Sequence, residues 1–145
     1  MKSLKISLFI LVIFLISCEY KYDMYLEGVK ITNSLFESKE TIYFECDILG
    51  NTIVEIPFND SFEVPINQLW KNTNPYSYKT MGKIHNEIIR KYNFRIYRYK
   101  DAKKQYFSFE KRYLTLIYDG CGFREKIDNV SYVYYDVHAE EQFWE

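Results

Sequence analysis

Residues 41–58 read TIYFECDILGNTIVEIPF, and the predicted fold class follows from this stretch. Apolar and polar side chains alternate over Thr41–Leu49, as they do in a strand that is buried on one face only. Thr52–Phe58 alternates in the same way, and Gly50 and Asn51 between the two runs suit a two-residue hairpin turn. The sequence therefore predicts an antiparallel hairpin whose core-facing residues are Ile42, Phe44, Cys46, Ile48, Val54, Ile56 and Phe58.

Short runs of the same kind continue on both sides of this hairpin. Asp23–Thr32 reads as a strand with a bulge at Gly28, because the apolar residues change phase at that glycine. Phe62–Leu69 contains Pro65, which cannot donate a hydrogen bond to a neighbouring strand and therefore predicts an edge strand. Further strands are predicted over 94–100, 105–110, 112–118, 123–127 and 130–138.

One segment has the period of a helix instead. Over Thr80–Tyr92 the apolar side chains recur three or four positions apart and form a stripe. A stripe of this kind needs an apolar surface to lie on, and a sheet provides one. The seven or eight predicted strands are joined mostly by connections too short for parallel crossovers. We therefore expect an α+β fold, mainly an antiparallel sheet with one packed amphipathic helix near 80–92.

The first 18 residues, MKSLKISLFILVIFLISC, have the layout of an export signal. Lys2 and Lys5 provide a positively charged start, and Ile6–Ile16 form an apolar core of 11 residues. A helix that spans a membrane needs about 20 apolar residues, so this segment is predicted to be a removable signal peptide. Its last four residues, LISC (15–18), resemble the lipobox of bacterial lipoproteins.

This resemblance covers residues 1–18 only, and it implies both a location and an anchor. In bacterial lipoproteins the cysteine receives a diacylglycerol and the chain is cut just before it. Residues 1–17 would thus be removed, and Cys18 would anchor a single domain, 18–145, to a membrane outside the cytoplasm; two acyl chains give stable attachment. Glu19 stands where an Asp would favour the inner membrane, which implies the outer membrane if the cell has one.

Charge is distributed in three blocks along the remaining chain. Residues 19–70 carry 3 basic and 10 acidic residues, residues 71–112 carry 12 and 3, and residues 113–145 carry 2 and 7. The basic block can form an ordinary solvated face by pairing with the two acidic blocks. Alternatively, it can face an anionic lipid or an acidic protein partner. Nucleic acid is not expected as a partner, because the signal places the chain outside the cytoplasm.

The sharpest part of the basic block is interleaved with tyrosines. Strand alternation places Arg95, Tyr97 and Tyr99 on the face opposite Phe94 and Ile96. A basic, aromatic face of this kind suits anionic groups through charge and planar or sugar partners through stacking. The predicted anion or partner patch consists of Arg95, Tyr97, Arg98, Tyr99, Lys103 and Lys104.

Cysteine and histidine are the remaining chemically active residues. Besides the lipidated cysteine there are Cys46 and Cys121, an even pair that permits a disulfide in an oxidising compartment. Spacing alone does not decide this bridge, because Cys46 lies on a predicted core face and Cys121 in a predicted turn. Catalysis by Cys121 with His138 as base has the right residue types but no motif around it. Asp136 shares a strand face with His138, and His85 is expected to be a partly exposed helix residue.

These features together predict a non-enzymatic, membrane-anchored module for binding or assembly in the cell envelope. No metal-ligand spacing and no cofactor motif is found in the sequence. An alternative is an immunity protein that neutralises a secreted toxin, which a small domain held at the membrane would suit. An alternative of another class is a small hydrolase that uses Cys121 or His138.

Overall fold

The computed structural model describes residues 22–115 and 121–145, without the side chains of Tyr78, Thr115 and Cys121. The predicted signal peptide and Cys18 therefore lie outside the described residues. Within them, eight strands form two four-stranded sheets, which we name sheet A (order β4-β1-β8-β7) and sheet B (order β3-β2-β5-β6). The elements are β1 Tyr22–Ser34, β2 Ile42–Glu45, η1 Asp47–Leu49, β3 Val54–Ile56, β4 Ser61–Thr73, α2 Tyr78–Lys91, β5 Arg95–Lys100, β6 Lys103–Tyr106, α3 Phe109–Thr115, β7 Cys121–Ile127, β8 Val130–Glu140 and η2 Glu141–Phe143.

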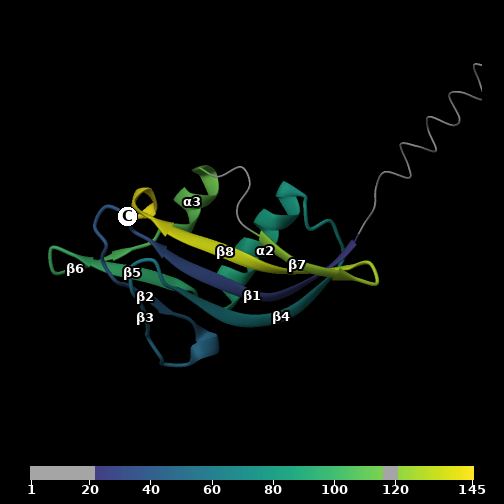
Figure 1. The fold of residues 1–145 in the computed structure, drawn as a ribbon, viewed down its shortest axis with the longest axis horizontal. Coiled ribbons are helices and arrows are strands. Elements are labelled where there is room, and N and C mark those ends of the chain that lie inside the picture. The colour runs from purple at the N-terminus through teal and green to yellow at the C-terminus, as the bar shows by residue number, and fades with distance from the viewer. Residues whose placement is uncertain (1–21, 116–120) are drawn as a thin grey trace, which may run out of the picture.

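Sheet A consists of long strands that run along the long axis of the molecule (Figure 1). β1 pairs antiparallel with β4 on one side and parallel with β8 on the other, over Asp23 to Ser34. The expectation of an antiparallel sheet is thus correct for most strand pairs and wrong for this one. Short connections exclude parallel pairing only between neighbours in sequence, whereas β1 and β8 come from opposite ends of the chain.

Two local features of sheet A confirm predictions made from single residues. The register shifts between Leu26 and Gly28 in both pairings of β1, so the bulge lies where the apolar phase changes. Gly28 is needed there, since an added Cβ would lie 2.8 Å from the Val64 carbonyl oxygen. Pro65 lies on β4, which is an edge strand of the sheet.

Sheet B contains the predicted hairpin, but with a different turn. β2 and β3 pair antiparallel with Phe44 opposite Val54, whereas a two-residue turn at Gly50 and Asn51 would place Phe44 opposite Pro57. The connection between β2 and β3 is longer than the predicted two-residue turn, because it contains η1. η1 forms a hydrogen bond with the end of α2 instead of continuing the pairing with β3. The Asp47 amide donates to the Tyr92 carbonyl at 2.9 Å. This tertiary contact overrides the local turn signal.

The helix predicted near 80–92 is present as α2. Its Ile84 and Ile88 are buried in the core, and it ends before Asn93, which takes a left-handed conformation with φ 50°. The prediction of a single helix is wrong, however, because the helix α3 begins at Phe109. It replaces the end of the strand expected over 105–110, which stops at Tyr106, and the start of the strand expected over 112–118; residues 116–118 lie outside the described residues. Ser108 explains the change, since its Oγ accepts from the Lys111 amide at 3.1 Å and caps the helix.

Both sheets and both helices share one hydrophobic core. Phe44 of sheet B is fully buried and its ring contacts Phe62 of sheet A, while Tyr135 of β8 contacts α2 and α3 on the same face. The C-terminal tail belongs to this core as well, because Phe143 and Trp144 are buried. Among the described residues, we find no helix with the length and apolar composition required to cross a membrane.

Candidate functional site

The outer face of sheet B, which points away from the core, gathers tyrosines from three strands. Cross-strand register puts Tyr43 of β2 beside Tyr97 of β5, and Tyr97 beside Tyr106 of β6. Two residues further along the same face, Glu45 lies opposite Arg95, and two residues in the other direction Tyr99 lies opposite Lys104. We call this surface the tyrosine face and define it by Tyr43, Glu45, Arg95, Tyr97, Tyr99, Lys104 and Tyr106.

The rings of the tyrosine face hold one another in place. Tyr43 stacks on Tyr97 with centroids 5.4 Å apart and planes at 16°, and Tyr99 meets both rings edge-on. Lys104 covers Tyr97, with Nζ 4.4 Å from the ring centroid. Tyr97 is 2% exposed and lies beneath the other rings of the face. Its burial raises the pKa of its hydroxyl, and the positive charge of Lys104 offsets part of this increase. Tyr99 and Tyr106 are 48% and 42% exposed and present ring surface to the solvent.

Four of the six residues of the predicted patch lie on the tyrosine face, and the other two do not. Arg95, Tyr97, Tyr99 and Lys104 share the tyrosine face, as the alternation of β5 predicts. Arg98 and Lys103 do not belong to it, because alternation turns both to the other side of the sheet. The sequence reasoning also missed Tyr43, Glu45 and Tyr106. Tyr43 and Glu45 were predicted to share an outer face of their own strand, but the pairing of that strand with β5 has no signal in the sequence.

Arg98 is buried and ties the C-terminal tail to sheet B. Its Nη1 lies 2.7 Å from Glu141 and 3.5 Å from Glu40, and its Nε donates to Gln105 at 2.8 Å. The guanidinium also lies over Trp144, 4.9 Å from the ring centroid. Burial disfavours the charged form of Glu141, but hydrogen bonds from the Ser38 amide and from Arg98 outweigh it and lower the pKa of this carboxyl.

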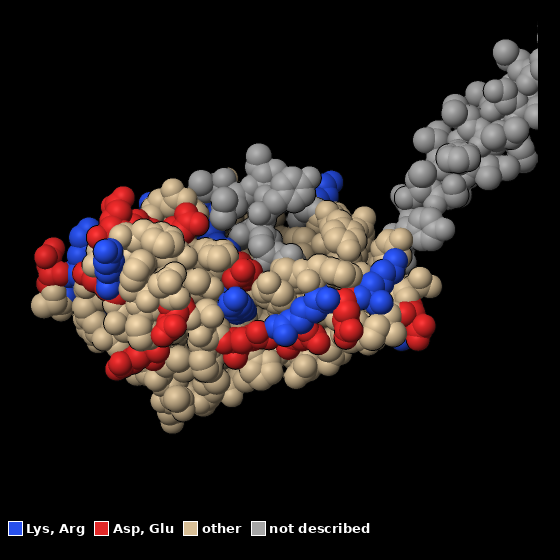
Figure 2. Space-filling model, viewed as in Figure 1, with Lys and Arg blue, Asp and Glu red and all other residues tan. Residues whose placement is uncertain are grey.

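The basic block pairs with both acidic blocks, as in the plainer of the two charge interpretations. Arg95 contacts Glu45, with Nη1 3.3 Å from Oε1, and Arg98 contacts one carboxylate from each acidic block. On sheet A, Arg124 forms ion pairs with Glu27 and Glu63. Figure 2 shows acidic and basic side chains next to one another on the visible face rather than in separate regions. The tyrosine face is therefore not a purely cationic surface.

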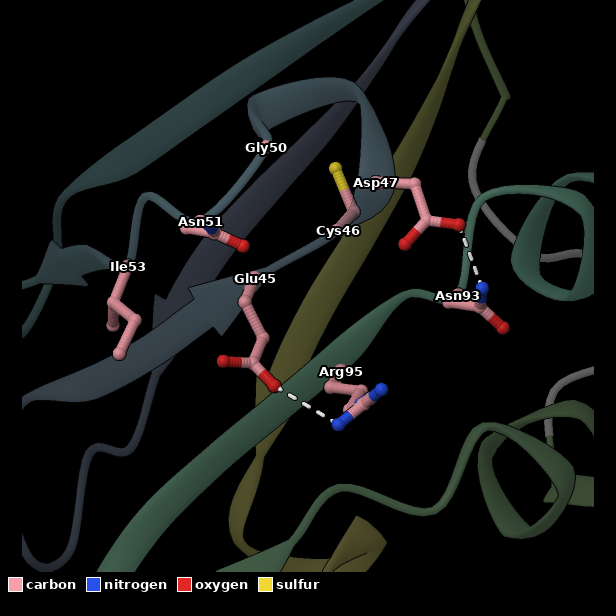
Figure 3. Close-up of a pocket in the computed structure, with 8 residues that line it drawn as sticks. All are labelled: Glu45, Cys46, Asp47, Gly50, Asn51, Ile53, Asn93 and Arg95. Atoms are coloured by element: carbon pink, nitrogen blue, oxygen red, sulfur yellow. Dashed lines mark hydrogen bonds and ion pairs between the residues drawn. The ribbon is translucent and has the colours of Figure 1, made fainter.

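A small polar pocket adjoins the tyrosine face and shares two residues with it (Figure 3). Its volume is about 280 Å³, and Glu45 and Arg95 face each other on one side of it. On another side, Asp47 Oδ2 accepts from Asn93 Nδ2 at 2.6 Å. The pocket is lined by Glu45, Cys46, Asp47, Gly50, Asn51, Ile53, Asn93 and Arg95.

Cys46 borders this pocket, and its side chain is buried and forms no disulfide with a described residue. Burial raises the pKa of its thiol, although hydrogen bonds from the Leu49 and Ile48 amides oppose the effect. A buried thiol of raised pKa is a poor nucleophile. The side chain of Cys121, the other half of the predicted disulfide and the predicted nucleophile, lies outside the described residues, so both ideas stay predictions.

His138 lies in a row of polar side chains at the end of sheet A. Its Nε2 is 3.1 Å from Asp136 Oδ2, and its Nδ1 is 3.4 Å from the hydroxyl of Ser34 on β1. The strand-face relation between Asp136 and His138 is thus confirmed, and Ser34 is a neighbour that the sequence did not reveal. Ser34 is only 6% exposed, which leaves its hydroxyl poorly placed to attack a substrate.

His85 is buried, contrary to the expectation of a partly exposed residue. It is 3% exposed, and the Tyr135 hydroxyl lies 2.8 Å from its Nε2. The same hydroxyl accepts from Arg112 at 2.8 Å, and Arg112 also donates to the Asp136 carbonyl at 2.6 Å. This cluster joins α2, α3 and β8, and it is closed to a ligand because His85 and Arg112 are both buried.

Within residues 22–115 and 121–145, no group of three or more His, Cys, Asp or Glu side chains is arranged to hold a metal ion. The tyrosine face and its pocket are therefore the strongest candidate site among the described residues. They combine exposed rings, fixed by neighbours, with polar groups at their border. Comparisons of the chain with protein-family models, with curated proteins and with solved structures found no match.

Proposed function

We propose that this chain is a lipid-anchored, non-enzymatic binding module of a bacterial cell envelope, and that it binds its partner with the tyrosine face. The observation that carries the proposal is the pair of exposed rings, Tyr99 and Tyr106, which each pack against the buried Tyr97. Tyrosine and arginine are enriched at binding surfaces because they provide large contact areas with few rotatable bonds. Rings already held by their neighbours lose little further freedom on binding.

The charge of the face supports recognition by stacking and hydrogen bonds rather than by charge alone. Arg95 forms an ion pair with Glu45, and Lys104 lies over the ring of Tyr97, so both cations already interact with another residue of the face. On the tyrosine face, the charge of Arg95 is thus balanced by a carboxylate of the first acidic block. This arrangement favours a partner other than an anionic lipid headgroup as the occupant of the tyrosine face.

The first prediction concerns the lipid anchor at Cys18. Replacing Cys18 with Ala removes the thiol that would carry the diacylglycerol, and the protein is expected to shift from the membrane fraction and to stop incorporating labelled palmitate. Cell fractionation and palmitate labelling measure both effects. Cys46→Ala is the matched control. Because Cys46 is buried in the folded domain, this variant should leave both readouts unchanged. A Cys18→Ala variant that still carries palmitate would contradict the anchor.

The binding surface makes the second prediction. A photoreactive phenylalanine analogue at Tyr99 is expected to give a discrete crosslinked product in producing cells. The same analogue at Tyr76, an exposed tyrosine outside the tyrosine face, is the matched control and is expected to give no such product. Electrophoresis of the affinity-purified protein measures both. Equal crosslinking patterns at the two positions would overturn the tyrosine face as the binding surface.

The structure bears differently on the two alternative functions, an immunity protein and a small hydrolase. An immunity protein is one form that a binding module can take, and a crosslinked product that contains a secreted toxin would identify it. A hydrolase is favoured by the hydrogen-bonded row of Asp136, His138 and Ser34. It ranks below binding because the Ser34 hydroxyl is buried, whereas the rings of the tyrosine face are open to a partner.

A further inference from the structure

We propose that the partner of the tyrosine face is a saccharide, with one sugar unit in the polar pocket and the adjoining units stacked on the exposed tyrosines. This inference rests on the proposed function, because it names the class of partner for the same site. It follows from three properties of the described residues: the continuity of the face with the pocket, the chemistry of the pocket wall, and the pairing of the strands beneath.

The face and the pocket form one continuous surface. Glu45 lies two residues after Tyr43 on β2, and Arg95 lies two residues before Tyr97 on the antiparallel β5, so both are a step of about 7 Å from the tyrosines. The same Glu45 and Arg95 form one side of the pocket, as Figure 3 shows. A ligand that fills the pocket and extends past this ion pair therefore meets the tyrosine rings next.

The pocket wall offers both hydrogen-bond donors and acceptors at short range. Glu45 and Asp47 accept, Arg95 donates, and the amides of Asn51 and Asn93 do both. Two carboxylates and one guanidinium leave no excess of positive charge, which disfavours a phosphate or another anion. A sugar ring carries several hydroxyls that each donate and accept, and it carries apolar faces that pack on aromatic rings.

The size of the pocket sets how much of the ligand it can hold. Its volume of about 280 Å³ is at the lower end of small-molecule sites, which run from roughly 300 to 1,000 Å³. One sugar unit fits this space, and the rest of a chain would extend over Tyr99 and Tyr106. The partner should therefore be an oligosaccharide or the end of a glycan rather than a free monosaccharide.

An extended peptide has less to bind here. β2 and β5 are the central strands of sheet B, and each pairs with a neighbour on both sides. Their backbone hydrogen-bonding groups are used within the sheet, so a peptide cannot add as a further strand beside Tyr43, Tyr97 or Tyr99. Recognition depends on the side chains alone, and these side chains match a polyhydroxylated ligand.

Titration of the full chain with oligosaccharides tests the inference. The chain is purified in a detergent without a sugar headgroup and titrated with chitotriose, cellotriose, maltotriose and mannotriose, with tyrosine fluorescence and calorimetry as readouts. At least one probe is expected to bind with a Kd between roughly 10 μM and 1 mM. Tyr99→Ala and Glu45→Gln should each weaken that binding about tenfold or more, while Tyr76→Ala, away from the site, should not change it.

The variants also control for folding, because Tyr99 is half exposed and Glu45 lies at the surface, so all three should unfold at the same urea concentration as the wild-type chain. If none of the four probes binds at about 10 mM while the crosslink at Tyr99 persists, the saccharide inference is wrong and the proposed function stands. If the crosslink fails as well, both are wrong. Saccharide binding that is insensitive to Tyr99→Ala and Glu45→Gln would place the ligand elsewhere and overturn the inference.

Discussion

As the pH falls from 6.5 to about 3, the protein is expected to lose up to about 1.4 kcal/mol of stability per pH unit because of one residue, His85. Burial, and next to it the charge of Arg112, lowers the pKa of this imidazole from 6.5 to about 3. The unfolded chain takes up a proton on His85 below pH 6.5, whereas the folded chain excludes it until about pH 3. The stabilisation is therefore complete above pH 6.5, and roughly 4–5 kcal/mol of it is lost by pH 3.

Urea unfolding at several pH values between 7.5 and 4 measures this loss in the wild-type chain and in His85→Gln. Glutamine does not titrate, and its side-chain oxygen can still accept from the Tyr135 hydroxyl. The variant should be less stable than the wild type at pH 7.5, and the gap should close steadily as the pH falls. His138→Gln removes the other histidine, so its profile separates the contribution of His85 from that of His138. Parallel pH profiles for wild type and His85→Gln would refute the assignment.

Arg98→Met is expected to cost about 2–4 kcal/mol of unfolding free energy at pH 7. The Arg98 side chain is 6% exposed and contacts Glu141, Glu40 and Trp144, so its removal leaves a partly buried carboxylate without its cation. The estimate is below the full range for buried pairs because the Glu141 side chain is 23% exposed and water screens it in part. Urea unfolding of both proteins gives the difference.

A matched control lies three residues away on the same strand. The Arg95 side chain is 59% exposed and also pairs with a carboxylate, yet Arg95→Met should cost less than about 1 kcal/mol. The lowered pKa of Glu141 adds a pH test: its stabilisation is complete above its ordinary pKa of 4.5 and is lost as the pH falls through the lower folded value. Arg98→Met should reduce this acid dependence. Equal costs for the two arginine variants would contradict the buried role of Arg98.

The sequence predicts those parts of the fold that depend on near neighbours. Alternation identifies Ile42, Phe44 and Cys46 as buried and Arg95, Tyr97 and Tyr99 as residues of one outer face, and the structure confirms both. The same prediction is wrong for Ile48, because the strand ends at Glu45 and Ile48 lies in η1, where it is 36% exposed. The bulge at Gly28, the edge position of Pro65 and the helix near 80–92 follow from equally local signals. Each depends on a period or on the geometry of a single residue.

The remaining features depend on contacts between distant segments. Tyr43 and Tyr97 are 54 positions apart, and no pattern in either strand shows that they stack. Nothing in the sequence distinguishes Arg98 from the exposed basic residues around it. In the fold it is buried beside two carboxylates from distant segments, Glu40 and Glu141. The turn of the first hairpin fails as a prediction for the same reason, since the end of α2 holds Asp47. The candidate site could thus be predicted only in part, as Arg95, Tyr97 and Tyr99 of β5 with Lys104 of β6, without the residues of β2.

β8, the last strand of the described residues, lies in the middle of sheet A, between β1 and β7. Until residues 130–140 have been made, β1 has no partner on that side, and its pairing with β8 then joins Thr32 to His138, 106 positions further along the chain. Such a high contact order makes folding slow. A nascent chain that remains unfolded this long is in a suitable state to be threaded through a narrow secretion channel, the route that its N-terminal residues predict.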